Sequence, residues 1–431
     1  MDLLDEIDRW GEVAPEHPAH ISGDRVLTFG ELRQRSDALA ASLCASDGVS
    51  RAPVAVLGHK EPEMLIAFLG AVKAGRPYVP IDISIPPQRA QRIVETSGAT
   101  LTLTPERVAE LSSQAVGTFT RRPLASTDPF YILFTSGSTG EPKGVIITLG
   151  NLTAFLAWMS GEQRFVERGE VFLNQAPFSF DLSVMDLYLS LTTGGTLFSI
   201  GKEHVANLKE LFQALASSDV TTWVSTPSFA QMCLIERSFA TATLPRLKRF
   251  LFCGETLAPE TAAQLLERFP DAEVWNTYGP TEATVATTSV RIDRSVIDAW
   301  SPLPIGRAMP GTQVVILDSE QRPVPEGERG EIVIAGPNVS PGYLRRPDLT
   351  KRAFFPLEGM PAYRTGDWGR RRGDLLFCEG RMDGQVKVNG YRIELGDLEA
   401  NLRALPEIAD AVVLPVVKNG RMDSLTAFVV L

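Results

Sequence analysis

The sequence contains little of the side chains on which disulfide, zinc or histidine chemistry depends. Its four cysteines are far apart and form no CxxC pair, and its four histidines form neither HExxH nor another zinc-binding pattern. We therefore expect no disulfide framework, no zinc site and no histidine-based active site. The cysteine usage favours a reduced, cytoplasmic compartment.

Long apolar runs and an excess of basic charge are also absent from the sequence. No stretch approaches about 18 uninterrupted apolar residues, so we expect no membrane span. The first segment, MDLLDEIDRWGEVAPEHPAH, has neither the basic region nor the apolar region of a signal peptide. The formal net charge is -10, whereas binding to nucleic acid requires a basic face for the phosphates. We therefore expect no nucleic-acid partner.

The chain is long, and strand-like apolar segments alternate regularly with helical segments along it. Its 431 residues are too many for one ordinary core, so two or three domains are expected. The expected strands are 53–58, 78–82, 221–227, 249–255 and 274–279, and the expected helices are 62–75, 86–98 and 262–270. This order of strand, helix and strand predicts parallel sheets with helices on their faces.

The C-terminal part of the chain has a different pattern. Strands are expected at 312–318 and 330–336, joined by the turn segment SEQRPVPEGER, which predicts a small antiparallel module. Beyond this module, an amphipathic helix and two strands of a small α+β unit are expected at 395–405, 411–417 and 425–431. We place a domain boundary at Asp383, which separates residues 1–382 from the start of a C-terminal domain at 383–431.

A loop rich in glycine and hydroxyl groups, YILFTSGSTGEPKG at 131–144, follows one of the apolar runs. Its donors and flexible positions are Thr135, Ser136, Gly137, Ser138, Thr139, Gly140, Lys143 and Gly144. Together these backbone N–H groups, hydroxyls and one ammonium suit a polyphosphate. The spacing is not that of a Walker A loop. The alternative is a flexible surface loop with no ligand.

Four further motifs accompany this loop in a fixed order. They are AGRPYVPIDISIPPQR at 74–89, NTYGPTEAT at 276–284, YRTGD at 363–367 and GRMDGQVKVNGYRIELGDLE at 380–399. The set resembles the adenylate-forming superfamily of acyl-CoA synthetases, peptide-synthetase adenylation domains and luciferases, over essentially the whole chain. The resemblance implies an α/β fold, in which a large N-terminal domain of parallel sheets, helices and a small antiparallel module precedes an incomplete α+β C-terminal domain.

The same resemblance implies an ATP site that also holds Mg²⁺. It assigns the phosphates to residues 135–140 and Lys143, and the adenine to Asn276, Thr277, Tyr278 and Gly279, with Pro280 also part of the ATP site. Thr281 would contact the α-phosphate, and Glu282 would hold Mg²⁺, which prefers hard oxygen ligands. Asp367 would accept the ribose hydroxyls, Arg381 would lie near ribose and phosphates, and Asp383 would be the hinge. Lys143, Thr281, Glu282 and Arg381 are the candidates for catalysis.

Each of these side chains also has an ordinary structural interpretation. Glu282 could be a surface carboxylate, and Asp367 could cap a turn after Gly366. Arg381 could form an ion pair with Glu379 or Glu394. The run at 370–372, three consecutive arginines, has no role in the family and is expected to form a solvated turn.

The segment PFSFDLSVMDLY at 177–188 bears on the acid that is activated. In family members that activate amino acids, an aspartate in an F-D-x-S context binds the substrate's α-ammonium, and Asp181 stands at that place. A buried carboxylate without a cationic partner would cost several kcal/mol. The alternative is that Asp181 caps the helix that follows it. Asp186 is expected to be structural.

The sequence around Asp181 resembles one subfamily more closely than the others. Its members activate D-alanine as D-alanyl-AMP and pass it to the phosphopantetheine thiol of a carrier protein, for esterification of teichoic acids. By this resemblance Cys253 and Val285 would bound a cavity for one methyl group. Cys253 could instead be a small buried residue at the end of a strand. Chirality is implied by the resemblance and not by these residues.

One expected residue has no counterpart in the sequence. Family members carry a lysine in a P-x-x-x-x-G-K context near the end of the C-terminal domain, where it bridges the carboxylate and the α-phosphate. The last lysine here is Lys418, in VVKNGRMD, and Lys387 cannot be assumed to substitute. The sequence is therefore expected to be either a shortened form of a conventional enzyme or a natural truncation in which adenylation is slow.

Three functions remain open at this point. The first is a free-standing D-alanine-activating ligase, which the start at Met1 favours over an excised module. The second is an adenylation enzyme for another small amino acid in a peptide-synthetase pathway. The third, motivated by the missing lysine, is a non-catalytic nucleotide-binding protein.

Overall fold

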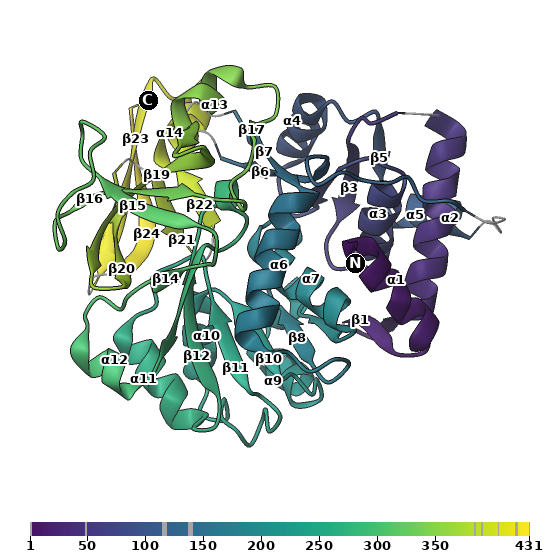
Figure 1. Ribbon diagram of the computed structural model, residues 1–431, viewed down its shortest axis with the longest axis horizontal. Coiled ribbons are helices and arrows are strands. Elements are labelled where there is room, and N and C mark those ends of the chain that lie inside the picture. Colours follow the sequence, from purple (N-terminus) through teal and green to yellow (C-terminus); the bar gives the residue numbers. More distant parts are fainter. Residues whose placement is uncertain are drawn as a thin grey trace.

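The computed structural model describes residues 2–47, 50–113, 119–136, 141–382, 385–388, 391–403, 405–418 and 421–430. Strands and helices form stacked layers, and α6 (Leu149–Gln163) runs through the middle of the view in Figure 1. Two sets of predicted residues lie outside the described ranges: Gly137 to Gly140 of the phosphate loop, and the hinge residue Asp383.

A six-stranded sheet of the described residues carries the phosphate loop. Its order is β17 (Gly342–Tyr343), β7 (Lys143–Thr148), β6 (Pro129–Thr135), β4 (Tyr78–Asp82), β3 (Val54–Gly58) and β5 (Leu101–Leu103). β3 is parallel to β4 and β5, and β4 is parallel to β6, as the strand–helix–strand pattern predicted. β7 and β17 are antiparallel additions at one edge.

A nine-stranded sheet, counted within the described ranges, forms the second layer. Its order is β14 (Arg307–Ala308), β13 (Thr288–Ile292), β12 (Glu273–Tyr278), β11 (Arg249–Phe252), β10 (Thr222–Ser225), β8 (Val171–Asn174), β9 (Thr196–Ser199), β1 (Pro18–Ser22) and β2 (Arg25–Thr28). The strands from β12 to β9 are parallel, as is the pairing of β9 with β1. The antiparallel strands at the two ends were not predicted from the sequence.

Helices α3 (Pro62–Lys73) and α7 (Leu182–Thr193) fill the space between the two sheets. Every residue of α3 is buried, as is every residue of α7 except the last. Both helices are predominantly apolar on every side, which suits them to the inside of a core. Successive residues of a strand face opposite sides of its sheet. On β11, Leu251 packs in the core between the two sheets, called here the inner core, and Phe250 packs in a second core on the other face of the nine-stranded sheet.

The remaining helices cover the outer faces and the flanks. α9 (Leu208–Ala216), α10 (Pro227–Leu234) and α11 (Pro259–Arg268) pack on the nine-stranded sheet, and α4 (Pro87–Ser97) packs on the six-stranded sheet. α1 (Leu3–Val13), α2 (Phe29–Asp47) and α6 enclose the inner core. The shorter helices are α5 (Pro105–Ser112), α8 (Lys202–Ala206), α12 (Arg294–Ala299) and the 3₁₀ turn η1 (Thr281–Ala283).

The predicted antiparallel module is a separate sheet. It comprises β15 (Gln313–Leu317), β16 (Gly330–Ala335), β18 (Phe354–Leu357), β19 (Met360–Arg372) and β20 (Leu375–Arg381), with α13 (Pro347–Ala353) beside it. The prediction of a solvated turn at 370–372 is wrong, because these arginines end β19 and pair with β20. Arg370 forms an ion pair with Glu379, and the turn follows at Gly373.

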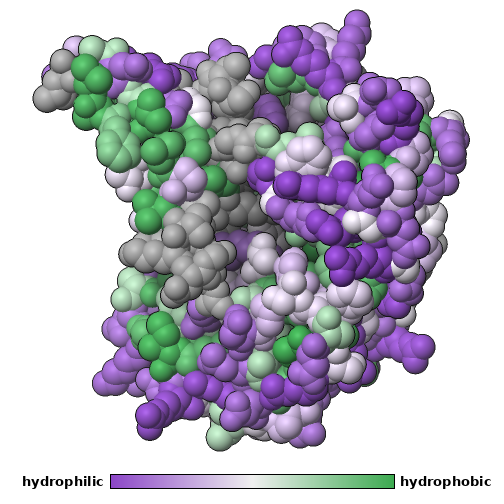
Figure 2. All heavy atoms as spheres, turned by 90° about the vertical axis from the view of Figure 1, so that its left-hand side faces the viewer, coloured by the Kyte–Doolittle hydropathy of each residue, from purple (hydrophilic) through white to green (hydrophobic). Residues whose placement is uncertain are grey.

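The C-terminal part consists of two hairpins and a helix. They are β21 (Gln385–Val388) with β22 (Tyr391–Glu394), α14 (Leu395–Arg403), and β23 (Asp410–Lys418) with β24 (Arg421–Val430). The β23–β24 hairpin exposes apolar side chains, among them Leu414 and Phe428. Figure 2 views the molecule from this side and shows apolar atoms gathered near its upper edge. The boundary at Asp383 stays a prediction.

None of the helices in the described part of the chain is long and apolar enough to cross a membrane.

Candidate active site

A cavity of about 310 Å³ lies where the carboxyl ends of strands from both large sheets meet the antiparallel module and α14. Ligands of open α/β sheets bind at this end of the strands. Among the predicted residues, the cavity is lined by Thr135, Ser136, Asp181, Gly279, Pro280, Thr281, Asp367 and Arg381. Residues that are far apart in sequence are thus brought to one site.

The phosphate loop is closed at its base by a pair of antiparallel strands. Thr135 on β6 is the register partner of Lys143 on β7. The hydroxyl of Thr135 is buried and has no hydrogen-bond partner among the described residues, although it lines the cavity. Since a buried hydroxyl without a partner is unfavourable, this donor fits an oxygen acceptor supplied by a ligand such as a phosphate.

Lys143 lies beside Glu282 and a tyrosine that sequence analysis missed. The Lys143 ammonium is 3.7 Å from the Glu282 carboxylate and 5.0 Å from the ring centroid of Tyr343. The Tyr343 hydroxyl donates to the Glu282 carboxylate at 2.8 Å. Burial, followed by the charge of Glu282, raises the pKa of Tyr343 far above its usual value, so Tyr343 remains a neutral donor.

Glu282 is fully buried, which excludes its interpretation as a surface carboxylate. Within the described ranges, no three or more histidines, cysteines, aspartates or glutamates are grouped closely enough to hold a metal ion by themselves. The single buried carboxylate of Glu282 fits Mg²⁺, which proteins commonly hold through one or two carboxylates while substrate phosphates and water complete its coordination.

Asp367 and Arg381 form the wall of the cavity on the side of the antiparallel module. The Tyr278 hydroxyl donates to one Asp367 oxygen at 2.6 Å, and the Arg381 guanidinium lies 3.2 Å from the other. Arg381 also donates to the Thr365 carbonyl at 2.7 Å. The suggested pairing of Arg381 with Glu379 is not formed, because Glu379 pairs with Arg370 and Arg329. A buried carboxylate on a cavity wall suits a ribose diol.

Asp181 is the residue directly before α7, but its side chain makes no capping hydrogen bond. It accepts instead from the Thr281 hydroxyl at 2.6 Å and lines the cavity beside Ser179 and Phe180. The geometry disfavours the alternative of a helix cap. Asp186 is fully buried and accepts from Asn174, in agreement with a structural role.

Cys253 and Val285 are both buried, and the Cys253 thiol donates to the Val285 carbonyl at 3.5 Å. Val285 has φ +67°, a conformation that is unfavourable for a β-branched residue. Neither residue lines the cavity, although Gly254 next to Cys253 does. Their assignment to the methyl pocket stays a prediction.

Two predicted adenine residues point elsewhere. The Asn276 amide donates to the Pro304 carbonyl at 2.8 Å, and the Thr277 hydroxyl donates to the Phe252 carbonyl at 2.8 Å. Both side chains are buried and help to hold β12 in place. Conversely, the cavity has walls that sequence analysis did not assign, including Asp82, Arg89 and Leu398. The motif at 74–89 could have indicated the first two.

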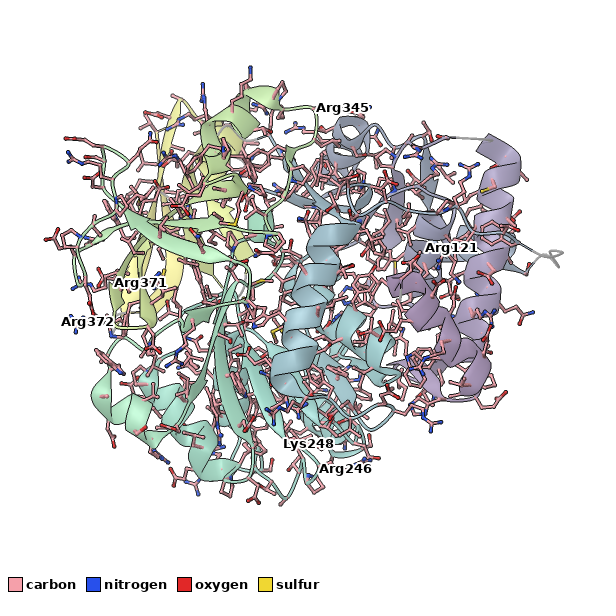
Figure 3. All side chains as sticks on the ribbon, viewed as in Figure 1. Arg121, Arg246, Lys248, Arg345, Arg371 and Arg372 are labelled. Atoms are coloured by element: carbon pink, nitrogen blue, oxygen red, sulfur yellow. The ribbon has the colours of Figure 1, made fainter. Side chains whose placement is uncertain are left out.

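Cationic side chains on the periphery are dispersed and mostly paired with acids. Arg121, Arg246, Lys248 and Arg345 lie in separate regions of the molecule, apart from the neighbours Arg246 and Lys248 (Figure 3). Arg121 pairs with acids of the N-terminal segment, Arg246 with Asp219, and Lys248 with buried Glu170. The positive charge available to a ligand is therefore better sought in the cavity than on these side chains.

Comparison with known proteins identifies the class to which this fold and site belong. A profile of the AMP-binding enzyme family matches residues 7–344, and the chain belongs to this family. The D-alanine–D-alanyl carrier protein ligase of Bacillus cereus (strain B4264) is 46% identical over 447 residues, covering 100% of this chain and 88% of that relative. The predicted superfamily is thereby confirmed.

Solved structures of adenylation domains share the fold. The Vibrio cholerae adenylation domain AlmE, in complex with glycyl-adenosine-5'-phosphate, has a TM-score of 0.87 and 23% identity, covering 99% of this chain and 88% of that one. The artificially fused adenylation–PCP di-domain NpsA-ThdA from Klebsiella oxytoca has a TM-score of 0.87 and 25% identity, with the same coverage. The predicted α/β fold class is confirmed.

Proposed function

We propose that this protein is an AMP-forming ligase that activates D-alanine with ATP and transfers it to the phosphopantetheine thiol of a carrier protein. In the first step, a carboxylate oxygen of D-alanine attacks the α-phosphorus of ATP, and the bond to pyrophosphate breaks. In the second, the thiolate attacks the carbonyl carbon of D-alanyl-AMP, and AMP leaves. The 46% identity to D-alanine–D-alanyl carrier protein ligase supports this proposal.

The observation that carries the proposal is the position of Asp181. It lines the same cavity as the proposed ribose and phosphate residues Asp367, Arg381 and Thr135. A carboxylate at one end of such a cavity can bind the α-ammonium of an amino acid while the nucleotide occupies the other end. Binding both reactants in one geometry is the main source of acceleration in such a reaction.

The remaining side chains have complementary roles in this proposal. Lys143 and Arg381 would stabilise the charge that develops on the phosphates, and Thr281 would orient Asp181 and the α-phosphate. Mg²⁺ on Glu282 would neutralise phosphate charge. Tyr343 would hold the Glu282 carboxylate in place before the ion arrives.

Amino-acid-dependent exchange between ATP and pyrophosphate tests the proposal. We expect exchange with D-alanine to exceed that with L-alanine or larger amino acids. Calorimetric binding of D-alanine in the presence of a nonhydrolysable ATP analogue gives a second readout that needs no turnover. A preference for L-amino acids in both measurements would contradict the proposal.

Asp181→Asn separates ammonium binding from helix capping. Asparagine caps helices about as well as aspartate, so a capping role predicts almost no effect. Loss of the carboxylate should weaken D-alanine binding about 100-fold, because the ammonium then lacks a partner of opposite charge. AMP binding should not change. Asp293→Asn, which alters a side chain that does cap α12, is the matched control and should leave both ligands unaffected.

A further inference from the structure

A buried lysine connects the two large sheets next to the segment that carries Asp181. Lys60 lies in the turn between β3 and α3, and its side chain is 3% exposed. Its ammonium donates to the Ala176 carbonyl at 2.6 Å, to the Asn174 carbonyl at 3.3 Å and to the Asn174 side-chain oxygen. An ammonium has three donors, and all three are used on one short segment.

Further hydrogen bonds fix Asn174 at the end of β8. The Ser199 hydroxyl on β9 donates to its side-chain oxygen at 2.8 Å, and its amide donates to Asp186 on α7 at 3.1 Å. The stretch from 175 to 181 is therefore held at its start by Lys60 and at its end by α7. No strand pairing or helix supports the residues between.

Burial of the Lys60 ammonium costs free energy, which argues for a specific role. Removing an ammonium from water costs several kcal/mol, and an apolar side chain of similar volume often packs at least as well. Lys60 is not within the cavity lining, so it does not contact the substrate directly. What it contacts is the backbone that leads to Ser179, Phe180 and Asp181, all of which line the cavity.

We propose that Lys60 is a positioning residue for amino-acid binding, which fixes residues 174–176 so that the Asp181 carboxylate faces the cavity. The inference rests on the proposed function, since it assumes that Asp181 binds the substrate ammonium. It predicts that Lys60 affects affinity for the amino-acid half of the adenylate and leaves affinity for the nucleotide half unchanged.

Lys60→Met tests this, because methionine fills similar volume without a charge or a donor. The probes are the sulfamoyl analogue of D-alanyl-AMP and the same analogue without its D-alanyl group, both measured by calorimetry. We expect the variant to bind the D-alanyl analogue roughly tenfold more weakly, as small displacements of positioning groups commonly cause. The analogue without D-alanine should bind within about twofold of the unaltered protein.

The sign of the effect separates positioning from electrostatics. Removal of a positive charge near a site for an ammonium, by Coulomb's law alone, strengthens ammonium binding. Weaker binding of the D-alanyl analogue therefore has to come from lost geometry. Equal weakening of both analogues would show a merely structural role and overturn the inference, as would no change in either.

Lys73→Met is the matched control. Lys73 is also fully buried and satisfied, by Asp8 at 2.6 Å, Asp37 at 2.7 Å and Ser36 at 2.9 Å, but these partners belong to α1 and α2 and not to the segment that leads to Asp181. The Lys73→Met variant should have a lower melting temperature, but the ratio of its affinities for the two analogues should be unchanged. If Lys60→Met does not fold, Ser199→Ala replaces it and must change that ratio in the same direction. If the unaltered protein binds both analogues equally, the proposed function fails, whatever Lys60 does.

Discussion

At the scale of single residues, three carboxylates of the candidate site accept hydrogen bonds from hydroxyl groups. Thr281 donates to Asp181, Tyr278 to Asp367, and Tyr343 to Glu282, at 2.6, 2.6 and 2.8 Å. Hydrogen bonds to a charged acceptor are stronger than neutral ones and fix the direction of the carboxylate. Each acidic side chain is thus oriented by a neutral neighbour before any ligand binds.

Tyr278→Phe should measurably destabilise the protein. The variant leaves the buried Asp367 carboxylate without one of its donors, and a hydrogen bond to a charged group contributes about 1.5–3 kcal/mol. We expect a loss of that size in the free energy of unfolding, measured with urea.

Tyr131→Phe provides the control for this prediction. The Tyr131 hydroxyl is equally buried but has no partner among the described residues, so its removal should be neutral or slightly stabilising. Equal destabilisation by both variants would mean that packing of the phenol oxygen, and not the bond to Asp367, accounts for the effect.

Sequence motifs predicted many of the cavity residues, but not the partners that orient them. Thr135, Asp181, Asp367 and Arg381 were found because they stand in motifs of one family. Tyr343 was missed because its position depends on β17, a two-residue strand that pairs with β7 from about 200 residues away. No local periodicity indicates such a contact. The same reason explains why Asn276 and Thr277 could not be excluded from the adenine site.

At the scale of elements, apolar runs with turn residues at their ends predicted the strands and helices well. Strand 78–82 is found as Tyr78–Asp82, and helix 62–75 as Pro62–Lys73. The partners of each strand were harder to predict. β1 joins the nine-stranded sheet beside β9, although about 180 residues separate them, and Ala19 of β1 and Leu197 of β9 share the inner core.

The β1–β9 junction contains a histidine that should make stability depend on pH. His20 is fully buried and bonded to Ser199 at 2.8 Å, and burial, with the charges of Lys60 and Arg25, lowers its pKa to about 3. In the unfolded chain the His20 imidazole takes up a proton near pH 6.5, whereas in the folded protein the same ring remains neutral at that pH. Stability from this group is therefore complete above pH 6.5 and is lost as the pH falls toward 3.

His20→Gln should remove this dependence. We expect the free energy of unfolding, measured with urea between pH 5 and pH 8, to fall more steeply for the unaltered protein than for the variant. Below pH 6.5 the difference should be up to about 1 kcal/mol per pH unit. Acidic residues titrate in both proteins, so the comparison isolates His20. Parallel stability curves over this range would contradict the assignment.

At the scale of the whole molecule, the C-terminal part meets the rest of the chain at the cavity. α14 contributes Asp397 and Leu398 to the lining, and Asp397 forms an ion pair with Arg89 of α4 at 3.2 Å. Asp397 is buried and Arg89 is partly so. A contact of this kind is stronger than a fully exposed ion pair, so it should help to hold α14 against α4.

Loss of the Arg89–Asp397 ion pair should make the molecule less compact in solution. We expect Arg89→Ala and Asp397→Ala each to increase the radius of gyration in small-angle X-ray scattering. The charge-reversed pair, Arg89→Asp with Asp397→Arg, should restore it, with a coupling energy of about 1 kcal/mol in a double-mutant cycle.

Arg107→Ala, which removes an exposed ion pair within α5, is the control and should leave the radius unchanged. If the two single variants at α4 and α14 scatter like the unaltered protein, contacts other than Arg89–Asp397 hold the parts together.

Because the cavity has walls from both parts, its occupants fall into two kinds. A compound that touches only the walls from residues 80 to 381 can bind whether or not α14 is in place. A compound that also reaches Leu398 selects molecules in which the parts are together, so its apparent affinity scales with the fraction of such molecules. An inhibitor of the second kind would lock the protein in one arrangement and stop any cycle that requires the parts to separate.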